Sequence, residues 1–269
     1  MSSIIQDTAA PLALITGASS GIGQAFARRL GAEGYNLIAI GRRRERLDAL
    51  VTELANVEVR PIVADLGIDA GVEVVADLCA AESLTMLVNN AGVAHYMPFT
   101  ELPAQKAAEL LQVKTVAPTM LSRAAVPGMV ARQSGAIINV SGMLAYGASA
   151  PLGPAPGRAT YVATLAHLVA LSQALHEELK GHGVRVQALC PGIVATEFHE
   201  RQGMDLSALP RMSPEDVVTA SLRGLELGEV VCAPGVERVE LLDAAQQANL
   251  AAFAGQSPQL AQRYRDAKP

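Results

Sequence analysis

Short apolar runs rich in β-branched residues alternate with longer segments of helical spacing along most of the chain. The apolar runs predict strands at 12–16, 36–40, 57–63, 84–89, 135–141, 184–190 and 229–233. The segments between them predict helices over 21–33, 44–55, 69–81, 104–132, 160–180 and 213–227. The strand runs are almost continuously apolar, as in strands buried on both sides. This alternation indicates an α/β fold, a doubly wound parallel sheet of about seven strands with helices on both faces.

Two irregular segments follow the ends of predicted strands. Residues 142–159 are rich in Gly, Pro and Ala, and residues 196–212 are polar. Ligands bind beyond the carboxyl ends of the strands in open α/β sheets, so we expect both segments near a ligand site. We interpret 196–212 as a substrate loop, and the aliphatic character of 142–159 favours an apolar pocket. No linker divides the sequence, which predicts one domain over 1–269, with a core at about 12–235 and a helical extension at 236–269.

The composition narrows the class of protein. The chain has 269 residues, of which 50% are hydrophobic and 3% aromatic, so its core must be aliphatic. A net charge of −5 gives no reason to expect nucleic acid or an anionic membrane as a partner. The first residues lack a signal-peptide pattern, and their apolar run is too short to span a bilayer. Cys79, Cys190 and Cys232 lack metal-ligand spacing, which favours buried thiols, a cytoplasmic location and no metal site.

The stretch LALITGASSGIGQAFARRL carries the most specific motif. A predicted strand ends at Thr16, and a T-G-x-x-x-G-x-G pattern leads into a predicted helix. Glycine lets the backbone turn sharply and approach a pyrophosphate, and a helix N-terminus offers free N–H groups to phosphates. The motif therefore predicts a dinucleotide-binding loop, with the following residues at the cofactor: Gly17, Ser19, Ser20, Gly21, Ile22 and Gly23.

The end of the second predicted strand decides between the two nicotinamide dinucleotides. An NAD site needs a carboxylate there to accept a hydrogen bond from the ribose 2′-hydroxyl, but this strand ends in Gly41. Arg42, Arg43 and Arg44 follow directly, and a guanidinium suits a 2′-phosphate. The alternative, a solvated basic helix start, is disfavoured because cations at a helix N-terminus oppose its dipole. We predict NADP(H), with Arg42 as the main contact and Arg43 as the second.

With NNAG at 89–92 and PGIVATEF at 191–198, the chain resembles the short-chain dehydrogenase/reductase family from about Leu12 to the Pro234–Gly235 turn. The resemblance implies a Rossmann-type fold and a homodimer or homotetramer built on two long central helices, here about 104–132 and 160–180. It also implies a small-molecule substrate. It adds the following cofactor contacts: Asp65 and Leu66 at the adenine, Asn90, Ala91 and Gly92 in the cofactor-side loop, and Pro191, Ile193 and Thr196 at the nicotinamide amide.

The catalytic positions depart from the family pattern of Asn, Ser, Tyr and Lys. Tyr161 falls at the place of the tyrosine, and Lys114, Gly142 and Leu165 stand at the other three places. Ser141 comes one residue before the serine position, and strand alternation turns it to the opposite face unless a bulge intervenes. The resemblance thus gives Tyr161, Lys114 and Ser141 as candidate catalytic residues.

The sequence leaves two alternative roles open for Lys114 and two for Tyr161. Lys114 either enters the space that Leu165 leaves vacant and supplies a cation beside Tyr161, or it lies on the surface of a helix flank. Arg158 is a weaker candidate for that cation. Tyr161 either donates a proton in catalysis or only lines a binding pocket. Candidate residues on the substrate side are His95, Tyr146 and His199.

Three functions follow from these residues. The first is NADP(H)-dependent carbonyl reduction of a small or medium apolar substrate. The second is non-redox chemistry, a lyase or isomerase on the same scaffold that uses Tyr161 and Lys114. The third is a catalytically silent module that binds the cofactor. A fold alone does not separate these alternatives, because function depends on the site.

Overall fold

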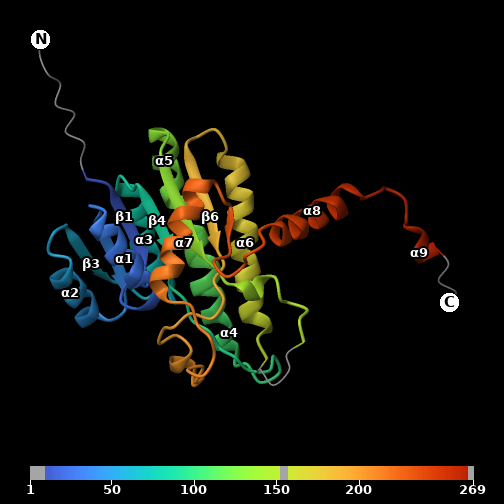
Figure 1. Ribbon diagram of the computed structural model, residues 1–269, viewed down its shortest axis with the longest axis horizontal. Helices are drawn as coiled ribbons and strands as arrows, with labels where there is room; N and C mark the ends of the chain where they lie inside the picture. The colour runs from blue at the N-terminus through green and yellow to red at the C-terminus, as the bar shows by residue number, and fades with distance from the viewer. Residues whose placement is uncertain (1–9, 152–156, 266–269) are drawn as a thin grey trace, which may run out of the picture. The chain divides into compact units, whose positions relative to one another are not determined.

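Seven parallel strands form one sheet in a computed structural model that describes residues 10–151 and 157–265 (Figure 1). The strand order is β3-β2-β1-β4-β5-β6-β7, so the chain reverses direction across the sheet between β1 and β4. The predicted α/β fold is confirmed, although residues 152–156 of the Gly- and Pro-rich segment lie outside the described residues. The strands are β1 (Leu12–Thr16), β2 (Asn36–Gly41), β3 (Val59–Val63), β4 (Met86–Asn89), β5 (Gly135–Val140), β6 (Val184–Leu189) and β7 (Val231–Cys232).

Helices α1 to α7 lie between the strands, as the sequence predicts, and α8 and α9 follow the last strand. Their boundaries match the predicted ranges to within a few residues, except in the segment 104–132. The helices are α1 (Gly21–Ala32), α2 (Arg44–Glu53), α3 (Asp69–Ala81), α4 (Ala104–Leu111), α5 (Ala117–Arg132), α6 (Ala159–Leu179), α7 (Pro214–Leu227), α8 (Glu240–Ala254) and α9 (Gln262–Arg265), with a π-helical turn η1 (Gln112–Val116) and short 3₁₀ turns η2 (Met143–Ala145) and η3 (Glu200–Gln202).

Both faces of the sheet are buried. Ala13 and Ile15 of β1 pack in one apolar cluster with side chains of α1, α2 and α7. Leu14, between them in sequence, packs in a second cluster with side chains of α3 and α5. Successive strand residues point to opposite faces, so a strand covered on both sides must be apolar throughout. This explains the uninterrupted apolar runs of the sequence.

The predicted helix over 104–132 is interrupted. The segment forms α4, the π-helical turn η1 and α5 in succession, and Lys114 lies in η1. A π turn inserts one extra residue per turn and redirects the side chains that follow, and such turns occur frequently at functional sites. Here the turn contains a lysine whose ammonium group bonds to the end of β5, so a buried polar contact accompanies the change in helical geometry.

Contacts divide the chain into two compact units, the first ending at Pro234 and the second beginning at Gly235. The second unit contains α8 and α9, in the segment for which a helical extension was predicted. The boundary lies where the sequence predicts the end of the core. Whether the two units behave as one domain stays a prediction.

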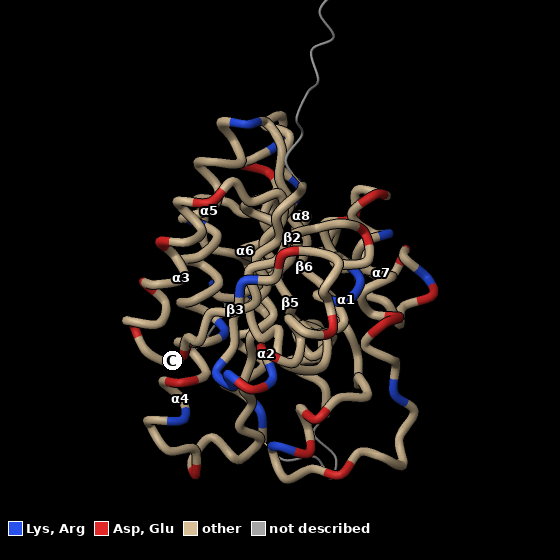
Figure 2. The backbone as a smooth tube through the Cα atoms, turned by 90° about the vertical axis from the view of Figure 1, so that its left-hand side faces the viewer, with Lys and Arg blue, Asp and Glu red and all other residues tan. Residues whose placement is uncertain are grey.

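Charged residues are interspersed along the backbone rather than separated by sign (Figure 2). Basic residues gather at the start of α2, where Arg42, Arg43, Arg44 and Arg46 occur within five positions. No helix in the part of the chain that the structure describes combines the length and apolar character needed to cross a membrane. Arg42 and Arg43 of the basic cluster at α2 line the cavity that is described below.

Candidate active site

A cavity of about 930 Å³ lies where β1, β2, β4, β5 and β6 end. It is bounded by the loops that follow these strands, at the place where the strand order reverses, as expected for a ligand site in an open α/β sheet. Nearly every residue predicted to contact a cofactor lines it. These residues are Gly17, Ser19, Ser20, Gly21, Ile22, Arg42, Arg43, Asp65, Leu66, Asn90, Ala91, Gly92, Pro191, Ile193 and Thr196.

The three glycines of the loop are required by its backbone. Gly17 and Gly21 have φ angles of +67° and +55°, in the left-handed region that favours glycine. A Cβ atom on Gly23 would lie 2.3 Å from the carbonyl oxygen of Gly17. Gly23 therefore brings α1 close to the loop without itself lining the cavity. The resulting turn presents the start of α1 to the cavity, which suits a phosphate group.

Thr16 and Asn90 join the glycine loop to the end of β4. The Thr16 hydroxyl oxygen accepts hydrogen bonds from the backbone N–H groups of Asn90 and Ala91, at 2.9 and 3.0 Å. The Asn90 side-chain amide donates to the carbonyl oxygen of Thr16 at 2.9 Å. Asn90 was predicted as a cofactor contact, and its amide group supports the loop itself. The structural role of Thr16 was not predicted.

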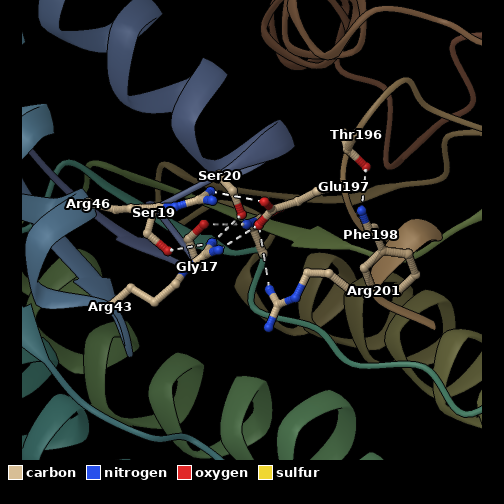
Figure 3. A network of polar contacts seen from close by, with 10 residues as sticks. Gly17, Ser19, Ser20, Arg43, Arg46, Thr196, Glu197, Phe198 and Arg201 are labelled. Carbon is tan, nitrogen blue, oxygen red and sulfur yellow. Dashed lines mark hydrogen bonds and ion pairs between the residues drawn. The ribbon is translucent and has the colours of Figure 1, made fainter. Parts of the chain in front are cut away.

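Arginine and serine side chains gather at one end of the cavity. The Arg43 guanidinium donates to the Ser20 hydroxyl at 2.9 Å and to the Ser19 hydroxyl at 3.3 Å (Figure 3). Arg42 is more open, with 45% of its side chain exposed and its Nη1 atom 3.9 Å from the Asp65 carboxylate. A Cβ on Gly41 would lie only 3.2 Å from the Ser19 hydroxyl oxygen, so a carboxylate side chain there would crowd the serine. Two guanidinium groups and two hydroxyl groups thus line this end of the cavity.

Glu197 is a charged residue of this region that the sequence did not single out. Its carboxylate pairs with Arg43 at 2.8 Å, with Arg46 at 3.0 Å and with Arg201 at 3.6 Å (Figure 3). Burial raises the pKa of Glu197, but hydrogen bonds from Arg43, Ser20 and Arg46 outweigh it and hold the pKa below its usual value. Glu197 is therefore an anion already bound to part of the arginine cluster.

Tyr161 lies at the other end of the cavity, at the start of α6. Its side chain is buried, and its ring meets the ring of Tyr96 edge to face, with centroids 5.2 Å apart. Burial raises the pKa of Tyr161 well above its usual value, and the charge of Tyr96 and a hydrogen bond with it act in the same direction. The phenol is thus held in its protonated form, which is the form of a proton donor.

Lys114 is buried, which excludes the alternative of a surface lysine on a helix flank. Its exposed fraction is 5%, and its Nζ atom donates to the carbonyl oxygen of Val140 at 2.8 Å. Both Lys114 and Tyr161 line the cavity, and the hydrogen bonds of the described residues include none between them. A Cβ on Gly92 would lie 3.5 Å from Nζ, which places the ammonium group beside the cofactor-side loop.

Leu165 and Gly142 occupy the two remaining catalytic positions, and Ser141 lies one residue before Gly142. Leu165 is buried, and a Cβ on Gly142 would lie 3.4 Å from its Cδ1 atom, so the leucine packs against the glycine. Ser141 lines the cavity, but its hydroxyl donates to the carbonyl oxygen of Leu165 at 2.9 Å. That bond commits the hydroxyl to the backbone of α6. The structure therefore does not support the prediction of Ser141 as a catalytic residue.

The substrate-side candidates are only partly confirmed as neighbours of the cavity. His199 lines it, and its ring stacks near that of Tyr96, with centroids 6.3 Å apart. His95 contacts the Glu109 carboxylate at 2.9 Å. The roles of His95 and Tyr146 on the substrate side stay predictions. Among the described residues, no three His, Cys, Asp or Glu side chains gather in a way that could hold a metal ion.

Apolar and aromatic side chains that were not predicted form the wall around Tyr161. Phe198 lies on one side of the tyrosine, with ring centroids 6.4 Å apart, and Tyr96 lies on another. Both come from segments that follow strands, and their proximity depends on the tertiary fold. The other apolar lining residues in this region are Leu144, Met204, Leu206 and Leu209.

Replacing Lys114 with methionine is expected to stabilise the cofactor-free protein at pH 7 by about 1–3 kcal/mol. Burial lowers the pKa of Lys114 from 10.5 to about 8, so the folded state disfavours its charge. The unfolded state then binds more protons between those values, and the stability of the unsubstituted protein rises with pH across that window.

Urea denaturation at pH 7 and at pH 10 measures this effect. The advantage of the Lys114→Met variant should shrink as the pH rises from about 8 toward 10.5, where the lysine is neutral in both states. A variant that is less stable at pH 7, or an advantage that does not change with pH, would contradict the burial of an unpaired ammonium group.

Comparison with known proteins places these features in a family. The sequence model described as short chain dehydrogenase matches residues 11–206. A very-long-chain 3-oxoacyl-CoA reductase of Pyrenophora tritici-repentis is 35% identical over 193 residues, which are 68% of this chain and 55% of that protein. The chain thus spans about half the length of that relative. A human protein named inactive hydroxysteroid dehydrogenase-like protein 1 is 34% identical over 69% of this chain and 56% of its own length.

A solved structure is similar to this chain over nearly its whole length. A short-chain dehydrogenase from Sphingobium yanoikuyae, in complex with NADPH, is 34% identical, with a TM-score of 0.89, and the match covers 94% of this chain and all of that one. The seven-stranded sheet, the glycine loop and the cavity at the strand ends agree with that similarity. The chain belongs to the short-chain dehydrogenase family of oxidoreductases.

Proposed function

We propose that the protein reduces the carbonyl group of a small or medium apolar substrate with NADP(H). One observation carries the proposal: a single cavity of about 930 Å³ joins the glycine loop and the arginine cluster to a buried, protonated tyrosine with apolar walls. When bound, the reduced cofactor supplies a hydride to the carbonyl carbon. The protein's own part is to bind both molecules, exclude water and supply the proton.

Tyr161 donates its phenolic proton to the carbonyl oxygen as the hydride arrives. Its raised pKa keeps that proton in place at neutral pH. Tyr96 offers a second hydroxyl beside it, where Gly142 has none. Phe198 and Leu209 contribute apolar surface that suits an apolar substrate and limits access of water. The two tyrosines thus replace the family's pairing of a serine with a tyrosine.

Lys114 is proposed to act on the cofactor side of the cavity. Its ammonium group lies beside Gly92, and the residue at the family's lysine position is Leu165, which has no polar group. A lysine donates up to three hydrogen bonds, of which the structure assigns one, to Val140. The remaining donors are available to hydroxyl groups of a bound nucleotide. In this role Lys114 supports cofactor binding and does not contact Tyr161.

The preference for NADP(H) over NAD(H) is expected to depend on Arg42. Replacing Arg42 with alanine should weaken NADPH binding about ten- to hundredfold, since a charge-assisted hydrogen bond contributes about 1.5–3 kcal/mol. NADH binding should stay nearly unchanged, because NADH carries no 2′-phosphate. Titration of each cofactor by its fluorescence measures both affinities. Equal affinities of the unsubstituted protein for NADPH and NADH would contradict the assignment.

A panel of aliphatic and aryl ketones, each incubated with NADPH, tests the proposed reaction directly. The expected result is slow loss of NADPH absorbance with bulky apolar ketones and little with polar ones. The same panel with NADH gives the cofactor control. Binding of NADPH with no turnover on any ketone would reject carbonyl reduction and leave the binding function.

A catalytically silent cofactor-binding protein is the second candidate. Leu165 stands where the family has its lysine, and one relative at 34% identity is named inactive. The lyase or isomerase alternative requires Lys114 and Tyr161 to act together, and their lack of a hydrogen bond in the described residues weakens it. Turnover of any ketone in the panel would support carbonyl reduction, and its absence would support a protein that binds the cofactor without catalysis.

The protein is also proposed to form a homodimer or homotetramer through the helical segments 104–132 and 159–179. Exposed apolar side chains on the first segment support this proposal, since burying them against another subunit would remove apolar surface from water. They are Leu111, Val116 and Met120, with exposed fractions of 47%, 39% and 40%.

A further inference from the structure

Glu197 links the segment after β6 to the start of α2. It belongs to the segment that follows β6, whereas its partners Arg43 and Arg46 lie at the start of α2 (Figure 3). About a quarter of the Arg43 and Glu197 side chains is exposed, so this ion pair is more protected than a surface pair. Among the described ion pairs, all that join the loop 196–212 to another element run through Glu197.

Arg43 and Ser20, which hold Glu197, also line the cavity, where a phosphate could reach them. Arg43 contacts Ser19 and Ser20 of the glycine loop as well as Glu197. Burial raises the pKa of Glu197, but hydrogen bonds from Arg43, Ser20 and Arg46 outweigh burial and hold the pKa below its usual value, so the carboxylate is charged at neutral pH. A phosphate on the same guanidinium groups would meet this negative charge at contact distance. Two such anions repel, so each weakens the binding of the other.

We propose that Glu197 competes with the 2′-phosphate of NADP(H) for Arg43 and Arg46, and that it is a determinant of cofactor specificity. The inference rests on the proposed NADP(H)-dependent function. NAD(H) has no phosphate at this position and leaves the Glu197 ion pairs intact. The 2′-phosphate of NADP(H) must displace the Glu197 carboxylate before it can bind the arginine side chains. Glu197 therefore reduces the preference for NADP(H) over NAD(H) that these arginines create.

Replacing Glu197 with glutamine separates these effects. The amide keeps the size of the side chain and removes the charge, so Arg43 and Arg46 become available to the phosphate. NADPH should bind about tenfold more tightly, which corresponds to the loss of two partly exposed ion pairs from the cofactor-free protein. NADH affinity should change less than about twofold, because no competing group is involved.

Glu200→Gln is the matched control. Glu200 lies in the same loop and is exposed, and the substitution changes the net charge by the same amount without touching the arginine cluster. Its NADPH affinity should equal that of the unsubstituted protein. A tenfold gain in this control as well would show a general charge effect and overturn the specific competition.

A second test asks whether Glu197 acts through the arginines. In a protein carrying Arg43→Ala and Arg46→Ala, the further change Glu197→Gln should no longer tighten NADPH binding. A gain that persists in this background would overturn the proposed route. Unchanged or weaker NADPH binding by Glu197→Gln alone would overturn the competition while leaving the proposed function in place. Failure of both the unsubstituted protein and the variant to bind NADPH would reject the proposed function and this inference together.

Discussion

Replacing Tyr161 with phenylalanine is expected to lower kcat for NADPH-dependent ketone reduction about 10²- to 10⁴-fold. The substitution removes one hydroxyl from a buried ring that already packs against Tyr96 and Phe198. The shape of the cavity should therefore persist while its proton donor is lost. The Kd for NADPH should stay nearly unchanged, since the glycine loop and arginine cluster lie at the other end of the cavity. Single-turnover kinetics with saturating NADPH measures the chemical step.

Tyr96→Phe provides the comparison. If Tyr96 only assists Tyr161, its loss removes one neutral hydrogen bond and should lower kcat by about tenfold or less. A Tyr161→Phe variant that keeps most of its activity would show that Tyr161 lines the pocket without donating a proton. A Tyr96→Phe effect as large as that of Tyr161→Phe would make Tyr96 the proton donor.

The parts of the fold that depend on local sequence could be predicted. The β-strands were found from their mostly apolar runs, because strands covered on both faces, such as β1 and β5, expose almost no side chain to water. The glycine loop was found because its backbone geometry favours glycine over other residues. Gly17 and Gly21 have positive φ angles, and at Gly23 a side chain would collide with the backbone of Gly17. Resemblance to the family then identified most of the residues that line the cofactor end of the cavity.

The parts that depend on contacts distant in sequence could not be predicted. The π turn at 112–116 leaves the apolar spacing of the segment nearly helical, so its sequence predicts one continuous helix. Glu197 is separated from Arg43 by more than 150 positions, and nothing local distinguishes it from other acidic residues of its loop. Tyr96 meets Tyr161 only because the segment after β4 packs against the start of α6. Lys114 was singled out because it stands at a catalytic position of the family. Its hydrogen bond to the backbone carbonyl of Val140 could not be predicted, because every residue carries such a group.

The direction of the reaction should be strongly biased toward reduction, and Leu165 is the physical reason. An unperturbed phenol titrates near pH 10, so about one tyrosine in a thousand is ionised at pH 7. Burial raises the pKa of Tyr161 further, and no described bond from a lysine opposes it. Reduction uses the protonated phenol and should vary little with pH near neutrality. Its rate will still be modest, because a weaker acid gives less driving force for proton transfer.

Alcohol oxidation needs the tyrosinate as its base, so it should be about a thousandfold or more below its limiting rate at pH 7. Its rate should rise about tenfold per pH unit and continue to rise beyond pH 10, because the pKa of Tyr161 is raised. Paired pH–rate profiles for one alcohol and its ketone, at saturating cofactor, measure both directions. Oxidation with an apparent pKa near neutrality would contradict the prediction and show that a cation acts on Tyr161. Lys114, which is charged below about pH 8, would then be the first residue to replace, because its loss should move that apparent pKa back toward higher pH.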